Sequence, residues 1–150
     1  MAIVDANAEA GRELAERLAS DIPAGCAIAE AGIEPTFAHL GQAVARLTVE
    51  DRHLNQVGVV QGGVYGIFAD ATAGFAAMSL LDESRTFATL EMRVNLLRGA
   101  RKGDVLVAEA RPIHAGSTTM VFEVRVRQEG DPRQRPFAFF TCTQLVMERQ

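Results

Sequence analysis

The spacing of apolar residues changes along this chain and predicts one helix near its start and strands after it. In residues 9–20, Ala10, Leu14 and Leu18 share one stripe among charged neighbours, which is typical of an amphipathic helix. Apolar and polar residues then alternate in five segments, as they do in half-buried strands. These segments are residues 42–49, 88–96, 104–114, 118–128 and 137–147. Residues 26–36 follow neither pattern.

Residues 57–81 form the most apolar part of the chain, with Asp70 as their single charge. A stretch of this length is long enough to cross a membrane. Five glycines interrupt it, however, and an ionised aspartate at the centre of a bilayer costs about 2.5–3.5 kcal/mol. We therefore predict a helix buried on every side, which begins at Gly62-Gly63 and ends by Asp82.

Together these segments predict an α+β fold, in which an antiparallel meander of strands curls around one long central helix. At 150 residues, the chain is expected to build one core rather than two lobes with a cleft between them. We expect an N-terminal helical segment, residues 1–24, and a single domain formed by residues 25–150.

The composition narrows the class of protein. With 48% hydrophobic and 23% charged residues, the chain is near the globular average, which argues against a disordered protein. Its net charge of −4 and its scattered basic residues argue against a nucleic-acid-binding protein. The N-terminal residues carry charges where a signal peptide is apolar, so we expect a cytoplasmic protein without membrane association. Cys26 and Cys142 match no metal-binding spacing, so we expect two buried free thiols and neither metal nor cofactor.

Asn55, the run Gln61-Gly62-Gly63 and Asp70 form a spaced motif around the predicted start of the apolar helix. This motif resembles the signature of the hotdog-fold acyl-CoA thioesterases, in particular their PaaI-like branch. In that family an asparagine precedes a His-Gly-Gly run at the mouth of the central helix, and an aspartate follows two turns into the helix. The sequence departs from the family at Gln61, which stands where the family has histidine.

The resemblance extends from about residue 42 to residue 147, and residues 89–98 look like the family's strand after the helix. It implies a hotdog fold and hydrolysis of a small or medium acyl-CoA, aliphatic or aryl, to the free acid and CoA. It also implies a homodimer as the minimal active unit, arranged further as a homotetramer that is a dimer of dimers. Each site would then combine Asp70 of one chain with Asn55 and the Gly62 amide of the other.

Each residue of the motif has a chemical role in that resemblance. Glycine at a helix N-terminus leaves a backbone N–H uncovered, so the Gly62 amide would form the oxyanion hole. Asp70 would act as nucleophile or as general base, and the sequence leaves both open. Asn55 would orient the thioester or the water, Gln61 would replace the family histidine as a hydrogen-bonding group, and Thr89 would help to place the water.

A second set of residues is expected to contact substrate. Gly63 lies beside the predicted oxyanion hole, and Arg98, Arg101, Lys102 and Ser117 would hold the phosphates of coenzyme A. The alternative for the basic residues is a solvated turn.

Two other functions compete with hydrolysis. Because Gln61 replaces the family histidine, the chain is alternatively a non-catalytic protein that binds or senses acyl-CoA. A hydratase or dehydratase with the same fold ranks last, since those enzymes present a histidine at the mouth of the helix. Asp70 alone would be equally consistent with a structural acid, and Asn55 alone with a loop cap.

Overall fold

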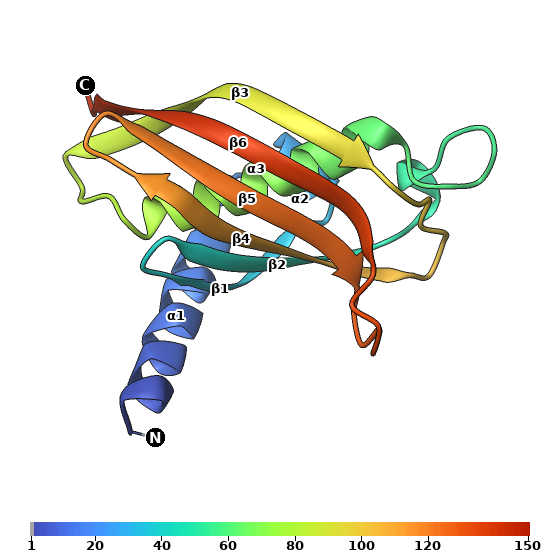
Figure 1. Ribbon diagram of the computed structural model, residues 1–150, viewed down its shortest axis with the longest axis horizontal. Helices are drawn as coiled ribbons and strands as arrows, with labels where there is room; N and C mark the ends of the chain where they lie inside the picture. The colour runs from blue at the N-terminus through green and yellow to red at the C-terminus, as the bar shows by residue number, and fades with distance from the viewer. Residues whose placement is uncertain (1) are drawn as a thin grey trace.

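A six-stranded antiparallel sheet curls around one central helix (Figure 1). The computed structural model describes the backbone of residues 2–150 and the side chains of residues 7–150. The helices are α1 (Ala2–Ser20), α2 (Ala27–Glu30), the 3-10 turn η1 (Asp51–His53) and α3 (Gly62–Met78). The strands are β1 (Glu34–His39), β2 (Gln42–Thr48), β3 (Arg85–Leu96), β4 (Val105–Ala115), β5 (Thr119–Gln128) and β6 (Pro136–Glu148). The predicted α+β fold is confirmed.

The order of strands corrects the predicted meander. The order is β1-β2-β4-β5-β6-β3, so only β4, β5 and β6 follow one another as a meander. β3 pairs with β6 at one edge of the sheet, and β4 crosses back to pair with β2. Residues 97–104 carry the chain from β3 at the edge of the sheet to β4 in its middle. In this order the sheet curls around α3, and the helix contacts both β2 and β4 and the opposite edge strand β3.

The central helix α3 begins at Gly62 as predicted and ends at Met78, four residues before the predicted limit. Its large side chains Tyr65, Phe68 and Phe75 are buried in the core. The prediction that the helix is buried on every side is wrong, because Ile67 and Met78 are each 40% exposed. One face of α3 is therefore open in the protomer. None of the helices in the described residues is long and apolar enough to cross a membrane.

Burial confirms the alternation predicted for β2 and for parts of β4 and β5. In β2, in residues 106–110 of β4 and in residues 120–126 of β5, every second residue points toward α3 and is 2% exposed or less, whereas residues 111–115 of β4 are exposed. The inward residues are Ala43, Ala45, Leu47, Leu106, Ala108, Ala110, Met120, Phe122, Val124 and Val126. Because these inward side chains are apolar, the core lies between α3 and the concave side of the sheet.

β3 departs from simple alternation at a β-bulge between Thr89 and Glu91. A bulge places two residues opposite one residue of the partner strand. The side chains that face one side of the sheet therefore switch from odd-numbered to even-numbered positions across it. Thr89 pairs with Gln144 of β6 and Met92 pairs with Cys142, and both of these β6 residues face α3. Uninterrupted alternation over residues 88–96 would place Thr89 and Met92 on opposite faces, so that prediction is wrong across the bulge.

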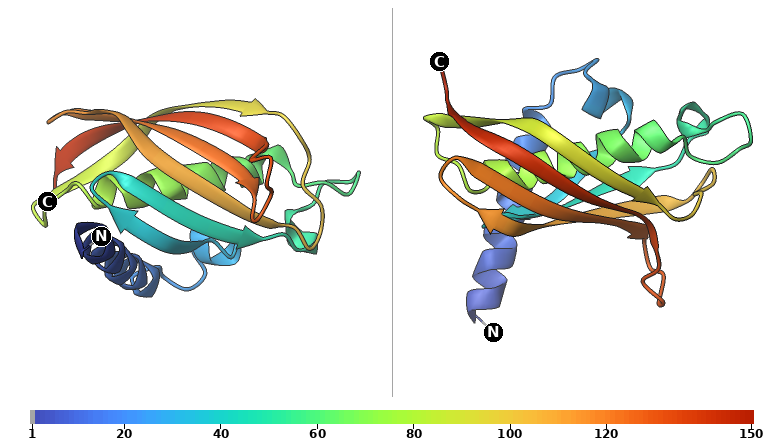
Figure 2. Two further views of the ribbon diagram at one scale, coloured as in Figure 1. Left: turned by 60° about the horizontal axis from the view of Figure 1, so that its bottom comes forward. Right: turned by 45° about the horizontal axis from the view of Figure 1, so that its top comes forward.

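Helix α1 packs against β1 on the outside of the core (Figure 2). Its buried stripe consists of Gly11, Ala15 and Leu18, with Leu14 half-buried beside them. Ala10, predicted to belong to this stripe, is exposed. A Cβ atom on Gly11 would approach the Phe37 ring of β1 to 2.1 Å, so glycine allows the helix to lie directly on that ring.

Candidate functional site

One stripe of α3 is almost free of side chains and faces the edge strand β3. The stripe contains Gly62, Gly66, Asp70 and Gly74, spaced by four residues and so by about one turn each. A Cβ atom on the three glycines would lie 2.8 Å from Leu96 Cδ1, 3.7 Å from Met92 Cε and 3.1 Å from Phe87 Cζ respectively. The glycines thus bring β3 close to the helix, and Asp70 is the single side chain of the stripe.

The carboxylate of Asp70 is held by Thr89. The Thr89 hydroxyl donates a hydrogen bond of 2.7 Å to Asp70 Oδ1, and the bulge described above is what turns Thr89 toward the helix. Asp70 is half-buried and Thr89 is exposed in the protomer, so the pair is open to solvent on one side. The structure brings these two predicted site residues together.

Cys142 lies behind Asp70 on the inward face of β6. Its thiol is fully buried, and burial followed by the negative charge of Asp70 raises the pKa of Cys142 to about 12. Both cysteines are free, as predicted, but Cys26 is half-buried rather than buried.

The N-terminus of α3 presents uncovered backbone donors. Gln61 is the N-cap residue, with an exposed side chain that makes no capping hydrogen bond. The first hydrogen bond of the helix runs from the Val64 N–H to the Gln61 carbonyl, so the N–H groups of Gly62 and Gly63 precede the ladder. A Cβ atom on Gly63 would meet nothing within 4 Å, so its backbone is accessible. This arrangement suits a negatively charged oxygen.

Asn55 organises the loop before the helix. Its Oδ1 accepts hydrogen bonds from the N–H groups of Val57, at 3.0 Å, and Val59, at 3.3 Å. The Asn55 side chain is half-buried, and the hydrogen bonds it makes within the described residues all use Oδ1. The Nδ2 donor therefore stays available while the side chain caps the loop.

His53 is structural. It is only 2% exposed, its Nδ1 accepts from the Glu50 N–H at 2.9 Å, and its Nε2 lies 3.0 Å from the Ala31 carbonyl. The neutral tautomer with a proton on Nε2 satisfies both partners. No group of three or more histidine, cysteine or acidic side chains within residues 7–150 has the geometry of a metal site.

The turn of residues 98–103 lies beside the mouth of α3. The Tyr65 hydroxyl accepts from the Ala100 N–H at 3.0 Å, and the Val60 N–H donates to the Ala100 carbonyl at 2.9 Å. Tyr65 is buried, and burial is the main cause that raises its pKa, so it remains a neutral hydroxyl. This anchor, which the sequence did not predict, fixes the turn to the helix.

The basic residues of that turn differ in whether their side chains are already engaged by other groups of the protein. Arg98 packs over the Phe137 ring at 4.2 Å and donates to the carbonyls of Arg135 and Pro136, so it is committed to the fold. Lys102 forms an exposed ion pair with Asp51 at 2.6 Å. The Arg101 side chain is exposed.

Ser117 does not join these residues within one protomer. It lies in the turn between β4 and β5, at the opposite end of the sheet from residues 98–103. The ten steps of β4 from Val105 to Ala115 span about 34 Å. A single phosphate group cannot bridge both turns of the same chain.

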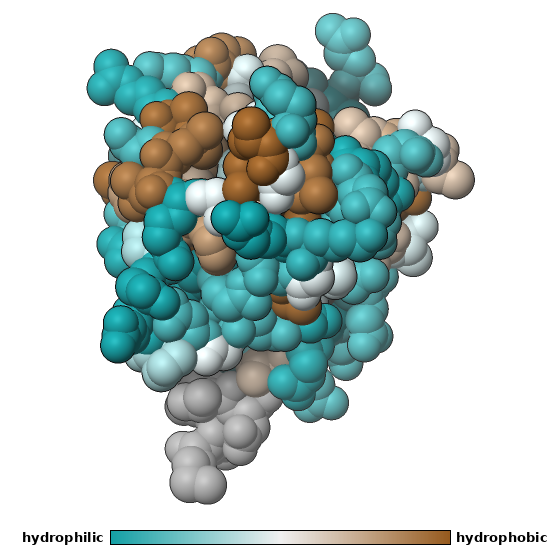
Figure 3. All heavy atoms as spheres, turned by 90° about the vertical axis from the view of Figure 1, so that its right-hand side faces the viewer, coloured by the Kyte–Doolittle hydropathy of each residue, from teal (hydrophilic) through white to brown (hydrophobic). Residues whose placement is uncertain are grey.

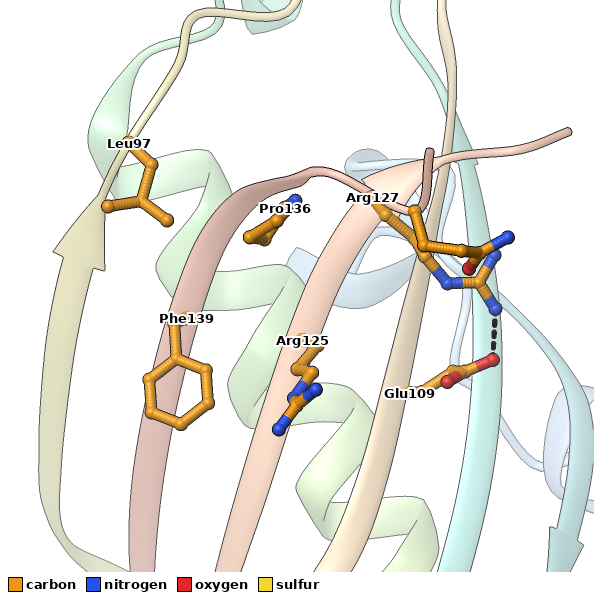
Figure 4. A pocket seen from close by; sticks show the side chains of 7 residues that line it. Leu97, Glu109, Arg125, Arg127, Pro136 and Phe139 are labelled. Carbon is orange, nitrogen blue, oxygen red and sulfur yellow. Dashed lines mark hydrogen bonds and ion pairs between the residues drawn. The ribbon is translucent and has the colours of Figure 1, made fainter. Parts of the chain in front are cut away.

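A pocket of about 290 Å³ lies on the outer face of the sheet, which points away from α3 (Figure 4). Phe139 lines one side of it, and the ion pair between Arg127 and Glu109 lies on the opposite side. The lining is completed by Leu97, Arg125, Gln134 and Pro136. Because Asp70 lies on the other side of the sheet, this pocket is not the site of the motif.

Apolar side chains are exposed around the mouth of α3 and along β3. Figure 3 shows hydrophobic atoms gathered over the upper part of the end where α3 begins, above a polar lower part. Exposed fractions reach 72% for Val57, 50% for Leu96 and 55% for Leu97. The prediction of a half-buried β3 therefore fails for the isolated protomer.

Gln144 is a buried polar residue that the sequence analysis did not single out. It occupies an inward position of β6, between Cys142 and Val146, and its side chain is 0% exposed. Neither Nε2 nor Oε1 has a hydrogen-bond partner within the described residues. In the sequence, Gln144 stands in β6 at a position where every second residue from 138 to 146 is otherwise apolar, and this polar interruption could have revealed it.

Comparison with known proteins now identifies the family. Residues 57–134 match the Thioesterase superfamily. The 1,4-dihydroxy-2-naphthoyl-CoA hydrolase of Listeria monocytogenes is 30% identical over 119 residues, which cover 79% of this chain and 94% of that protein. The solved structure of thioesterase HI1161 from Haemophilus influenzae has a TM-score of 0.80 and 26% identity, covering 89% of this chain and 90% of its own.

The E. coli PaaI protein shares the fold, with a TM-score of 0.76, 23% identity and coverage of 91% of this chain and 95% of its own. These likenesses agree with the resemblance drawn from the motif around Asp70 and with the sheet curled about α3. The chain belongs to the thioesterase superfamily, as a thioester hydrolase with the hotdog fold.

Proposed function

We propose that this protein is an acyl-CoA thioesterase that hydrolyses a small or medium acyl-CoA, aliphatic or aryl, to the free acid and CoA. The observation that carries the proposal is Asp70, a carboxylate placed by Thr89 on an otherwise bare stripe of a helix whose N-terminal amides are uncovered. The Listeria relative, a naphthoyl-CoA hydrolase by name, supports a CoA thioester as the substrate class.

Asp70 acts on the thioester carbonyl in one of two ways, which remain alternatives. As general base, it takes a proton from water while the water oxygen bonds to the carbonyl carbon; the C–S bond then breaks, and the CoA thiolate takes up the proton. As nucleophile, its Oδ2 bonds to that carbon and expels the thiolate; water then hydrolyses the anhydride to the free acid and the Asp70 carboxylate, and the proton released goes to the thiolate. Thr89 occupies Oδ1 in both cases, which leaves Oδ2 for the reaction.

The Gly62 amide supports the negative charge that develops on the carbonyl oxygen. A preorganised donor at this position contributes roughly 10²–10³-fold to the rate. Asn55 contributes its Nδ2 donor toward the thioester or the water, and Gln61 lies at the same mouth with an exposed amide. Gly63 leaves room for the substrate to approach.

The geometry of α3 supports a site shared by two chains. Asp70 lies eight residues after Gly62, which corresponds to about 12 Å along the helix axis. Reacting atoms must come within about 3–3.5 Å of each other, so this separation favours a site in which the two groups come from different chains. If two copies of α3 lie antiparallel with Asp70 opposite the partner's Gly62, the helices cross at the midpoint, which is Gly66.

The open face of β3 supports the same assembly. Met92, Val94 and Leu96 point to the helix side of the sheet, yet each is 40–50% exposed. A second copy would cover these residues together with Ile67 of α3. The homodimer is thus the proposed minimal active unit, further paired as a dimer of dimers; full activity of a monodisperse monomer in light scattering would contradict it.

Arg101 and Lys102 are proposed to bind phosphates of CoA, since their turn is anchored beside the mouth of α3. Arg98 would contribute mainly by holding that turn, because its guanidinium is engaged by backbone carbonyls. A contribution from Ser117 requires a different subunit, since this residue lies at the far end of the sheet.

The decisive test is hydrolysis of a panel of short-chain, medium-chain and aryl-acyl-CoAs by the wild type and by Asp70→Asn. We expect turnover by the wild type and a loss of at least about 10³-fold in the variant, within the range for a lost base. Asp21→Asn, at an exposed position, is the matched control and should keep full activity. Absence of turnover by the wild type contradicts the proposal; calorimetric binding of acyl-CoA without turnover would instead support the non-catalytic alternative.

A further inference from the structure

A buried, unpartnered amide lies directly beside the Asp70–Thr89 pair. Gln144 of β6 and Thr89 of β3 are cross-strand partners on the face toward α3. Directly opposed residues of an antiparallel pair have Cβ atoms about 4.5–5.5 Å apart, within reach of a glutamine side chain. On the other side of Gln144 lies Met120 of β5, which is buried and offers no strong hydrogen-bonding group.

The Thr89 hydroxyl is chemically able to accept a hydrogen bond from the Gln144 amide. A hydroxyl has one proton to donate and two lone pairs that accept. Thr89 gives its proton to Asp70 Oδ1, so its oxygen can still accept a hydrogen bond. Gln144 Nε2 carries two donors and has no partner, although the side chain is completely buried. A buried amide without partners destabilises a fold, so its presence beside the reactive carboxylate calls for a role in function.

We propose that Gln144 is a positioning residue, whose amide donates to Thr89 Oγ1 in the working enzyme and thereby fixes the Thr89 hydroxyl on Asp70 Oδ1. This bond requires the Gln144 side chain to turn toward its cross-strand partner Thr89. With Oδ1 held, the other carboxylate oxygen points in a constant direction toward the attacking water or the thioester. The inference rests on the proposed function, because it assigns Gln144 to the site in which Asp70 reacts.

Gln144→Met tests the role with little change of side-chain volume. If Gln144 positions Thr89, kcat should fall by about tenfold, the scale of one lost hydrogen bond, while KM stays nearly constant. The Tm should remain equal or rise, because the variant removes an unpaired amide from the core. Gln144→Asn, which keeps an amide on a shorter side chain, should lose less. Met120→Leu, at the other cross-strand neighbour, is the control and should keep both kcat and Tm.

A double-mutant cycle with Thr89→Val shows whether Gln144 acts through Thr89. We expect the Gln144→Met change to cost nothing further in the Thr89→Val background. Independent, multiplicative losses would overturn the proposal, as would a Gln144→Met enzyme with lowered Tm and unchanged kcat, which indicates a purely structural amide. Wild-type activity distinguishes failure of the proposed function from failure of the positioning role. If the wild type shows no turnover, the proposed function is contradicted. If the wild type turns over substrate and Gln144→Met does so equally fast, only the positioning role is contradicted.

Discussion

Three side chains near the site differ in what their surroundings allow them to do. Asp70 is half-buried, hydrogen-bonded by Thr89 and open on one side. His53 is buried with both ring nitrogens engaged by backbone groups, so its ring is not available to a substrate. Cys142 is buried behind Asp70 as a protonated thiol. Of the three, Asp70 is therefore the residue suited to chemistry.

The raised pKa of Cys142 predicts selective labelling of thiols. With a pKa of about 12, its thiolate fraction at pH 8 is about one in ten thousand, whereas an ordinary thiol near 8.5 is about one-quarter ionised. In the native protein at pH 8, iodoacetamide should modify Cys26 and spare Cys142, as read by mass spectrometry of peptides. In denaturant both should react. Equal labelling of the two in the native state would contradict the burial of Cys142.

His53 is predicted to matter for stability. His53→Ala removes a buried ring and leaves the Ala31 carbonyl and the Glu50 N–H without their partner, so the free energy of unfolding should fall by about 2–4 kcal/mol. Urea denaturation measures this. His114→Ala, at an exposed position, should stay within about 0.5 kcal/mol of the wild type. A similar small change for His53→Ala would show that its two hydrogen bonds do not support the fold.

At the scale of elements, periodicity predicted the strands that have one face in the core. β2, β4, β5 and β6 lie within a residue or two of their predicted limits, because burial on one face imposes strict alternation. β1 was not predicted, since it is short and contains Pro35, and α2 has only four residues. The strand order could not follow from local turns, because the pairing of β3 with β6 is a contact between distant segments.

From the sequence, only those parts of the candidate site that lie on a single element could be predicted, because their spacing along the chain fixes their relative positions. The positions of Gly62 and Asp70 follow from helix geometry once the helix start is known. The contact between Asp70 and Thr89 depends on a bulge, and a bulge leaves little trace in a pattern of apolar and polar residues. Gln144 and Tyr65 act through partners on other elements, which the sequence alone does not place.

Gly11 of α1 lies against β1, and we predict that replacing this glycine by alanine destabilises the protein. Alanine normally stabilises an exposed helix relative to glycine by up to about 1 kcal/mol. Gly11→Ala should instead lower the Tm, because the new Cβ would collide with the Phe37 ring. In a Phe37→Leu background, which removes the ring, the same change should be neutral or stabilising. A higher Tm for Gly11→Ala alone would show that α1 is not seated on that ring.

At the scale of the whole molecule, the protomer is incomplete on one side. The apolar face of β3 and the open face of α3 are contiguous with the mouth where Gly62 lies, so one surface contains both the site and the proposed contact between chains. Substrate would then bind where two protomers meet, and each dimer would hold two equivalent sites.

A shared site predicts complementation between two inactive variants. Asn55→Asp keeps an oxygen to cap the loop but loses the Nδ2 donor, and Asp70→Asn loses the carboxylate. When the two chains are co-expressed, mixed dimers contain one site with Asp70 and Asn55 both intact. Random pairing should restore about one-quarter of wild-type activity, measured as kcat per chain. A mixture no more active than its parts would show that each chain carries a site of its own.

The two edge strands of the sheet, β3 and β1, differ in length and composition. This difference limits how many copies of the protein can join through their edge strands. β3 offers twelve residues, six of them apolar, whereas β1 offers six residues, including Pro35, which lacks an N–H, and a break in register between Pro35 and Phe37. A short, bulged strand with proline is a poor template for another chain. Pairing β3 with β3 would thus give a closed pair with β1 at both ends, so the fold favours a finite assembly over a growing fibre.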